Sequence, residues 1–400
     1  MTLATRAPRH ARACNTDPSR RRLLGAATAA IVAPAGYAAT ALAAPTASSA
    51  GSARRFGFGL IGDIPYRWGE ATVLANLVSA WPTDLDFAIH LGDLKAGVGP
   101  CSDGLLESRA RILERSTIPL VYVPGDNEWT DCGRVLAGAF DPLDRLAWLR
   151  RRFFVPPFHR GRGALAVHSQ HERDPVHGLP ENLAWTRGNI AFVSINLPGS
   201  RDGEAAKLPA AQQQARRRAN ERWIRAAFAR ASAMGSPAIV VAIHADPSMQ
   251  IGADGPLSGR PPVDAEQRRR DPYLEFRRLL FEMTIGFDGQ VLLVHGDTHR
   301  FRDDHPWRKL APWVERAGYP LSALARRRLE TLRRVECFGS PLLGAWVRID
   351  WIPGREAGFE VSAQPIEPAG ANEPAARRPA GQSPTLPRGP RNATRAESRG

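Results

Sequence analysis

One repeated pattern constrains the fold of this chain more than any other. Short apolar runs end in Gly-Asp or in histidine, and stretches of helical spacing separate these runs. Apolar runs of strand length that alternate with helical segments predict a sheet covered by helices, and therefore the α/β class. The expected strands are 56–62, 86–91, 119–124, 190–197, 237–244, 290–295, 334–338 and 345–352. The expected helices are 71–80, 105–115, 141–152, 210–234 and 272–284.

The composition suits a folded body. Hydrophobic residues make up 43% of the chain and charged residues 24%, which is enough apolar material for a sizeable core. The net charge of +14 is spread over both ends and the middle, so we interpret it as solvated charge and expect no stable nucleic-acid partner. The sequence carries no signal for an oligomeric state.

The N-terminal 50 residues resemble an export signal. Arg20, Arg21 and Arg22 precede a weakly apolar stretch, and Ala41-Leu42-Ala43 supplies small residues at the spacing of a cleavage site. The paired arginines are typical of the twin-arginine type. We therefore predict a cleaved signal over 1–50, a domain over 51–365 and a disordered Pro/Ala/Arg-rich tail over 366–400. A membrane anchor is the alternative for the first segment, but its Ala, Gly, Thr and Pro content makes a poor span.

Export would place the mature protein in the periplasm or outside the cell, with no transmembrane segment. In that oxidising setting, Cys101 and Cys132, each in a loop after an expected strand, are candidates for a disulfide. Two unpaired thiols are the alternative. The chain has no C-x-x-C pair, which argues against a thiolate zinc site.

Acidic and histidine side chains recur at the ends of the expected strands. The carboxyl ends of parallel strands meet at one edge of a sheet, where ligands bind, so these side chains are expected to converge. Clustered carboxylates repel each other unless cations lie between them, and carboxylate with imidazole suits Fe, Mn or Zn. Two such ions would activate a water and bind a phosphoryl group. The converging residues are Asp63, Asp93, Asp126, His244, Asp297 and His299.

In order and spacing these blocks resemble the calcineurin-like metallophosphoesterase family, whose motifs are D-x-H, G-D, G-N-H-[DE], a single H and G-H-x-H. The resemblance covers residues 56–350 and implies a four-layer α/β/β/α sandwich. The segment 124–132, with its G-D-N-E-W phrase, looks like the signature of an exported bacterial subgroup. The matching blocks here are Asp63-Ile64-Pro65, Gly92-Asp93, Gly125-Asp126-Asn127-Glu128, His244 and Gly296-Asp297-Thr298-His299.

The resemblance also implies a ligand set for two divalent or trivalent ions. Asp63, Asp93 and His299 would hold the first ion, with Asp93 bridging to the second. The second ion would be held by Asp126, His244 and Asp297.

This chain departs from the family pattern at four positions. Pro65 stands where the family has a metal-binding histidine, and the neighbouring Tyr66 is a possible substitute ligand. Asp126 replaces an asparagine of the family motif and Asp297 a histidine. Asn127 replaces a histidine that protonates the leaving group, which leaves His295, His90 or a water as the candidates for that role.

The resemblance implies a hydrolase of phosphomonoesters or phosphodiesters that uses a metal-activated water, and the N-terminal signal implies that this hydrolase is exported. Asn127 would contact the substrate phosphate, although asparagine is also a common turn residue. A non-catalytic metal- or phosphate-binding protein with the same fold is the alternative function. We further interpret the proline-, glycine- and histidine-rich residues 155–183 as a loop that covers the site.

Overall fold

The computed structural model describes residues 54–249, 271–316, 321–342, 344–355 and 358–366, together with 266 and 269. The expected signal over 1–50 and the expected tail lie outside these residues, except that Ile366 is described. In this part of the chain, no helix combines the length and the apolar character that crossing a membrane requires.

Two β-sheets form the centre of the fold. The first has five strands in the order β12-β11-β1-β2-β3, and the second has seven in the order β4-β5-β6-β7-β8-β10-β9. The strands are β1 (Phe56–Ile61), β2 (Leu85–His90), β3 (Leu120–Tyr122), β4 (His168–Ser169), β5 (Leu183–Arg187), β6 (Ile190–Ser194), β7 (Ala238–Ala242), β8 (Gln290–His295), β9 (Arg302–Asp304), β10 (Leu332–Glu336), β11 (Ala345–Trp351) and β12 (Phe359–Pro365).

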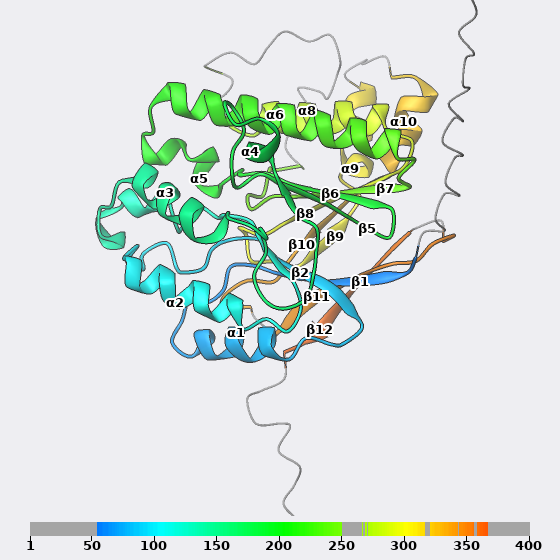
Figure 1. Cartoon of the computed structure of the whole chain (residues 1–400). Coiled ribbons are helices and arrows are strands. Elements are labelled where there is room, and N and C mark those ends of the chain that lie inside the picture. Colours follow the sequence, from blue (N-terminus) through cyan, green and yellow to red (C-terminus); the bar gives the residue numbers. More distant parts are fainter. Residues whose placement is uncertain are drawn as a thin grey trace, which may run out of the picture. The chain divides into compact units, whose positions relative to one another are not determined.

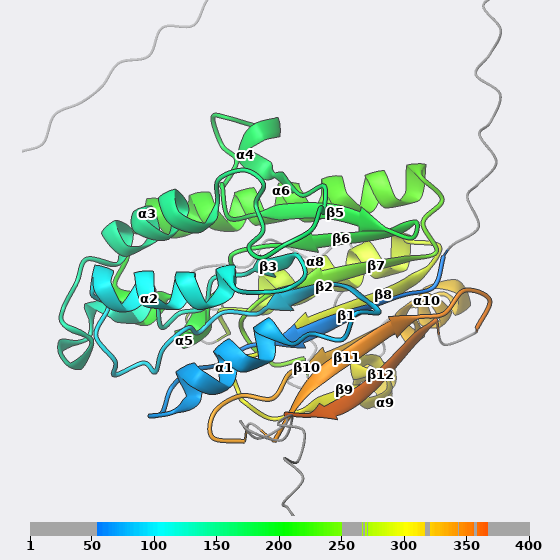
Figure 2. The same ribbon diagram turned by 60° about the horizontal axis from the view of Figure 1, so that its bottom comes forward.

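Helices cover the outer faces of the two sheets, as Figures 1 and 2 show. In Figure 1, α6 and α8 lie above the second sheet, whereas α1 and α2 lie below the first. The expected α/β/β/α sandwich is therefore confirmed. The helices are α1 (Glu70–Ser79), α2 (Asp103–Glu114), α3 (Pro142–Phe153), α4 (Gln170–Arg173), α5 (Gly199–Asp202), α6 (Ala210–Ala233), α8 (Leu274–Gly286), α9 (Pro306–Arg316) and α10 (Ala323–Glu330).

Aromatic side chains pack the two sheets together. Phe58 on β1 and Phe87 on β2 contact Phe192 on β6, with ring centroids 5.5 and 5.2 Å apart, and Phe87 also meets Trp185 on β5 at 5.9 Å. These rings bury large apolar areas in edge-to-face contacts, so they contribute strongly to the core. A second apolar cluster joins the other face of the second sheet to α6 and α8.

The inner strands are parallel, and the parallel direction positions the site. β1, β2 and β3 run parallel in the first sheet, as do β6, β7, β8 and β10 in the second. Parallel strands are covered on both faces, which explains their continuous apolar runs. The loops at their carboxyl ends gather at one edge of each sheet.

Residues 155–183 are not the covering loop that their composition suggested. They contain β4, α4 and the start of β5, because Ser169 caps α4 and β4 pairs with β5 at the edge of the second sheet. None of the residues lining the pocket described below comes from this segment.

Candidate metal centre

The six expected metal ligands lie together where the carboxyl ends of the two sheets meet. Asp63, Asp93 and Asp126 follow β1, β2 and β3 of the first sheet. The other three come from the second sheet, since His244 follows β7, and Asp297 and His299 follow β8.

The imidazole of His244 lies among three carboxylates. Its Nε2 is 3.2 Å from Asp126 Oδ1, 3.4 Å from Asp93 Oδ1 and 3.9 Å from Asp297 Oδ1. Its Nδ1 is 2.7 Å from the carbonyl oxygen of Leu91, which holds the ring in place from the first sheet. Such a contact to the second ring nitrogen is what orients metal-binding histidines in proteins.

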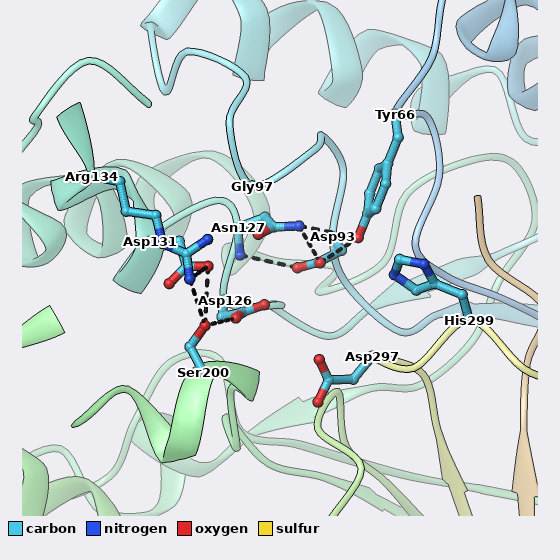
Figure 3. A pocket seen from close by; sticks show the side chains of 10 residues that line it. All are labelled: Tyr66, Asp93, Gly97, Asp126, Asn127, Asp131, Arg134, Ser200, Asp297 and His299. Carbon is cyan, nitrogen blue, oxygen red and sulfur yellow. Dashed lines mark hydrogen bonds and ion pairs between the residues drawn. The ribbon is translucent and has the colours of Figure 1, made fainter. Parts of the chain in front are cut away.

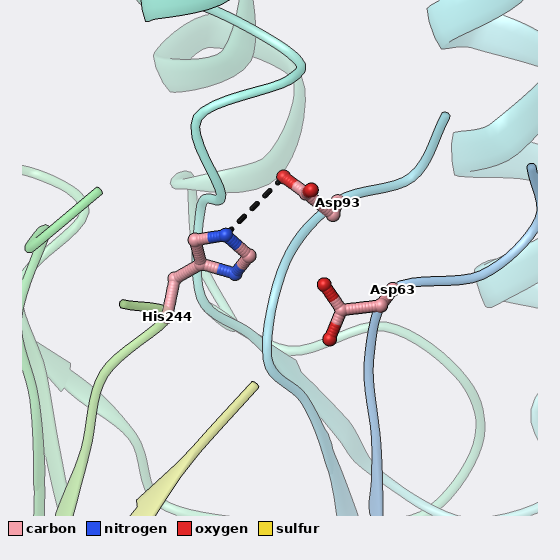
Figure 4. Close-up of side chains that lie close together, drawn as sticks. All are labelled: Asp63, Asp93 and His244. Carbon is pink, nitrogen blue, oxygen red and sulfur yellow. Dashed lines mark ion pairs between the residues drawn. The ribbon is translucent and has the colours of Figure 1, made fainter. Parts of the chain in front are cut away.

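Two groups of ligand atoms are close enough to hold an ion. Asp63, Asp93 and His244 form one group (Figure 4), and Asp126, His244 and Asp297 form the other, with the ligand atoms of each group within 4.8 Å of one another. The second group matches the ligand set expected for the second ion. In the first group His244 stands where His299 was expected, while His299 Nε2 lies 3.4 Å from Asp63 Oδ1.

The backbone at this edge is strained. Asp63, Asp93, Asp297 and His299 all have positive φ, at 55°, 61°, 77° and 64°. Residues with a side chain rarely adopt this region, and each costs about 1–3 kcal/mol that the surrounding structure must offset. Three of the four carboxylates are therefore aimed at the cluster in spite of a local cost, which is typical of functional sites.

Gly92 and Gly125 allow the loops after β2 and β3 to touch. A Cβ atom on Gly92 would collide with the backbone of Gly125, and one on Gly125 would collide with the backbone and carboxylate of Asp93. The glycines of these two Gly-Asp steps thus allow the two loops to approach closely, and this approach brings Asp93 next to Asp126.

The charges of the cluster are unbalanced without a cation. Burial raises the pKa of Asp93 well above its usual range, although His244 opposes the shift, and burial with neighbouring Asp126 raises the pKa of Asp297 to about 6. Burial alone would lower the pKa of His244, but Asp93 and Asp126 more than offset this and raise it well above its usual range. Buried carboxylates crowded around an imidazole are a donor set that divalent or trivalent cations fit, because a cation would offset the repulsion between the carboxylates.

Glu128 holds together the loops that follow β2 and β3 through hydrogen bonds to their backbone. Its carboxylate accepts hydrogen bonds from the backbone N–H groups of Gly125 at 2.8 Å, Asp93 at 3.0 Å and Leu94 at 3.3 Å, and from the hydroxyl of Tyr122. The Glu128 side chain is fully buried and does not line the pocket. Glu128 therefore acts on the site by holding Asp93 and its loop in place.

Tyr66 reaches into the position that Pro65 leaves without a ligand. Its hydroxyl donates to Asp93 Oδ2, lies 3.3 Å from Asp63 Oδ1 and accepts from Asn127 Nδ2 at 3.1 Å. Burial, reinforced by Asp93, raises the pKa of this phenol well above its usual range, so it is a hydrogen-bond donor in the absence of a cation. The phenol oxygen lies directly between the two carboxylates of the expected first ion.

The two residues expected to act on the substrate lie in different surroundings. Asn127 lines the pocket, and its side-chain amide donates to Asp93 Oδ2. His295 is fully buried and does not line the pocket, and its Nδ1 lies 2.9 Å from the carbonyl oxygen of Gly296. Burial lowers the pKa of His295 to about 4, with Asp246 opposing the shift. The structure therefore brings Asn127, but not His295, to the pocket.

The pocket over the cluster contains three residues to which the sequence patterns assigned no role. Asp131, Arg134 and Ser200 line one side of it (Figure 3). Ser200 Oγ lies within hydrogen-bond distance of Asp126 Oδ2 and 3.1 Å from Asp131 Oδ2, so its single proton can be donated to either carboxylate, and it accepts from Arg134 Nη2 at 3.1 Å. Ser200 lies in α5, beyond the end of β6, so the rule of polar residues directly after a strand does not identify it. Asp131 lies in the segment 124–132 noted in the sequence, whereas Arg134 carried no sequence signal.

Comparison with known proteins yields similarity in structure only. No family model matches the chain, and no curated protein matches its sequence. Among solved structures, GAP50, the anchor in the inner membrane complex of Plasmodium, aligns with a TM-score of 0.38 and 10% identity over 78% of this chain and 85% of its own. The purple acid phosphatase PPD1 from yellow lupin (Lupinus luteus) seeds aligns with a TM-score of 0.43 and 12% identity over 79% of this chain. The match spans about half of the lupin chain, 52% of its length.

Proposed function

We propose that this protein is an exported, metal-dependent hydrolase of phosphomonoesters or phosphodiesters. The observation that carries the proposal is the group of four carboxylates around His244, gathered from the ends of parallel strands in two sheets. The resemblance of the sequence blocks to the calcineurin-like metallophosphoesterases supports the same assignment. The Cys101–Cys132 disulfide supports the export component, since such bonds persist in oxidising compartments.

The residues that would hold two ions are those of the cluster. Asp63 and Asp93, with His299 or Tyr66, would hold the first, and Asp126, His244 and Asp297 would hold the second. Bound there, the ions would supply Lewis-acid polarisation of the phosphoester and an acidified water. Iron, manganese and zinc are the ions that best fit carboxylate with imidazole.

The protein's own groups then have distinct tasks. Asn127 contributes an amide donor at the pocket wall, and Glu128 holds the backbone that carries Asp93. Leu91 orients His244 through its carbonyl oxygen. A positioned donor that meets developing charge typically contributes about 100-fold or more to the rate, so Asn127→Ala should slow turnover while leaving metal content unchanged.

The test compares Asp93→Asn with Asp144→Asn, a matched change at an exposed residue on α3. We expect the purified mature protein to contain metal and to hydrolyse a generic aryl phosphate. Asp93→Asn should lower the metal content and abolish turnover, because it removes a charge next to both ligand groups, whereas Asp144→Asn should change neither. Full metal content with undiminished turnover in Asp93→Asn would show that the cluster is not the catalytic centre.

A non-catalytic metal- or phosphate-binding protein is the second candidate. It is favoured by Pro65 and Asn127, which replace two histidines of the family motif. This function predicts metal in the wild-type protein, loss of that metal in Asp93→Asn, and no turnover of any phosphoester in either.

A further inference from the structure

Several exposed apolar side chains lie close in the sequence to residues that line the pocket. Of the nine large apolar side chains exposed in the described part of the chain, four lie within two residues of a residue that lines the pocket. Single exposed apolar residues are common on proteins, but consecutive ones that directly follow a pocket residue are candidates for a contact surface. The four are Trp68, Val98, Val135 and Leu136.

Three of these side chains, those of Val98, Val135 and Leu136, belong to two segments that a hydrogen bond and a disulfide connect. Val98 is 61% exposed, Val135 85% and Leu136 72%, and we call these three the apolar rim. The segment of Val98 is joined to that of the other two by the hydrogen bond from Cys101 N–H to the carbonyl oxygen of Ala137, at 3.0 Å, and by the disulfide. The apolar rim is therefore a fixed feature of the fold.

Arg134 lies in the chain directly before the apolar rim, and it lines the pocket. Its Nη2 is 2.6 Å from Asp131 Oδ2 and 3.1 Å from Ser200 Oγ, so the guanidinium is oriented by two residues. A Cβ atom on Gly97 would come within 2.9 Å of Arg134 Nη1 and 2.8 Å of Asn127 Oδ1. The absence of a side chain at Gly97 thus leaves room for both groups at the pocket wall, where Figure 3 shows them.

A guanidinium held in this way is suited to a phosphate. Arginine presents several N–H donors in one plane and matches phosphate oxygens better than a lysine does. Within the described chain, Nη1 of Arg134 has no hydrogen-bond acceptor, so it is available for a ligand. A molecule bound there would have its charged end at Arg134 and its other end at Val135 and Leu136.

We propose that the substrate is a soluble phosphoester whose ester group is apolar, with its phosphate at Arg134 and its aryl or alkyl group on the apolar rim. This inference rests on the proposed phosphoesterase function. One small molecule that carries a phosphate and an apolar group matches this arrangement, because Arg134 supplies a cation at the pocket and the next two residues supply exposed apolar side chains. A tenfold preference for an apolar group requires about 1.4 kcal/mol, or burial of about 55 Å² at about 25 cal/mol per Å², which one face of an aromatic ring supplies.

The experiment uses two non-hydrolysable ligands of equal charge, phenylphosphonate and methylphosphonate. Their affinities for the metal-loaded mature protein are measured by titration calorimetry. We expect phenylphosphonate to bind about tenfold more tightly. The double variant Val135→Ser/Leu136→Ser should lose this preference and keep its affinity for methylphosphonate, whereas Arg134→Ala should weaken both ligands about tenfold or more.

The matched control is Val176→Ser/Leu324→Ser, which changes exposed residues of the same types that do not line the pocket. It should keep the wild-type preference, and all variants should keep the wild-type metal content and melting temperature.

Equal affinities for the two phosphonates in the wild-type protein would overturn the inference while leaving the proposed function intact. Loss of the preference in the control variant would overturn it as well, and so would rim-dependent binding to phosphatidylglycerol vesicles without a preference between the phosphonates. If neither phosphonate binds, the proposed function itself fails.

Discussion

The disulfide between Cys101 and Cys132 joins the loop after β2 to the loop after β3. Both cysteines are fully buried, and both sulfur atoms lie 3.5 Å from the carbonyl oxygen of Asn127. The bond therefore sits under the segment that carries Asn127 and Arg134. Replacing both cysteines by alanine should lower stability and loosen the pocket wall together.

The expected loss of stability follows from the length of chain that the bond closes. For the separation of 31 residues, the chain-entropy relation gives about 12 cal/mol/K, or about 3.7 kcal/mol at 25 °C. That is a large part of the 5–15 kcal/mol by which folded domains are typically stable. We therefore expect Cys101→Ala/Cys132→Ala to lower the free energy of unfolding by about 3–4 kcal/mol.

The assay is equilibrium unfolding in urea, followed by circular dichroism, with and without a reductant. Reductant should lower the stability of the wild-type protein toward that of the double variant and leave the double variant unchanged. Cys337→Ala, which removes the free buried cysteine of the described chain, is the control and should remain sensitive to reductant. The affinity for phenylphosphonate should fall in the double variant, because Arg134 is no longer held by the closed loop.

A loss below about 1 kcal/mol in the double variant would refute this reasoning. So would an equal effect of reductant on the double variant, since that would place the stabilisation in another bond.

Two further changes test the support of the cluster. Glu128→Gln replaces a buried acceptor of three backbone N–H groups with an amide that turns a donor toward one of them, so we expect the free energy of unfolding to fall by about 2–3 kcal/mol in urea titrations. Its control, Glu107→Gln on α2, breaks solvent-exposed ion pairs and should cost less than about 1 kcal/mol; equal losses would contradict the brace that Glu128 forms. Tyr66→Phe should lower the iron content and remove any visible absorption that the iron-loaded protein shows, because a phenolate bound to Fe³⁺ absorbs visible light. Tyr273→Phe, which removes a buried phenol bonded to the carbonyl oxygen of Pro198, should leave both unchanged, and unaltered absorption in Tyr66→Phe would exclude the phenol as a ligand.

The buried parallel strands and some helix starts can be recognised from short stretches of the sequence. The strands β1, β2, β7 and β8 are continuous apolar runs, because a parallel strand is buried on both faces, and this pattern is visible in the sequence. Helices with a clear start are equally readable: Asp141 caps α3 and Pro142 occupies its first turn, as the sequence order predicts. The edge strands β4, β9 and β12 and the neighbouring β5 were not expected, since they are short or partly exposed and depend on the partner strand for their register.

The gathering of acidic residues and histidines at strand ends was also predictable, because the direction of parallel strands brings their carboxyl ends to one edge. The pairing of Cys101 with Cys132 followed from loop position and compartment, and the structure confirms it. The closeness of His244 to Asp63 and Asp93 did not follow from the sequence, because His244 follows a strand of the second sheet and is held by Leu91 of the first.

Only the tertiary structure placed Tyr66 between Asp63 and Asp93, and only it placed Arg134 beside Ser200. Tyr66 reaches Asp93 across 27 positions and Arg134 reaches Ser200 across 66 positions, so no local spacing reports these two contacts. They depend on how closely two backbones approach, as at Gly92 and Gly125, where the absence of a side chain sets the distance between the loops. Sequence patterns report the periodicity and the ends of strands, whereas side-chain packing between the two sheets decides which of those ends meet.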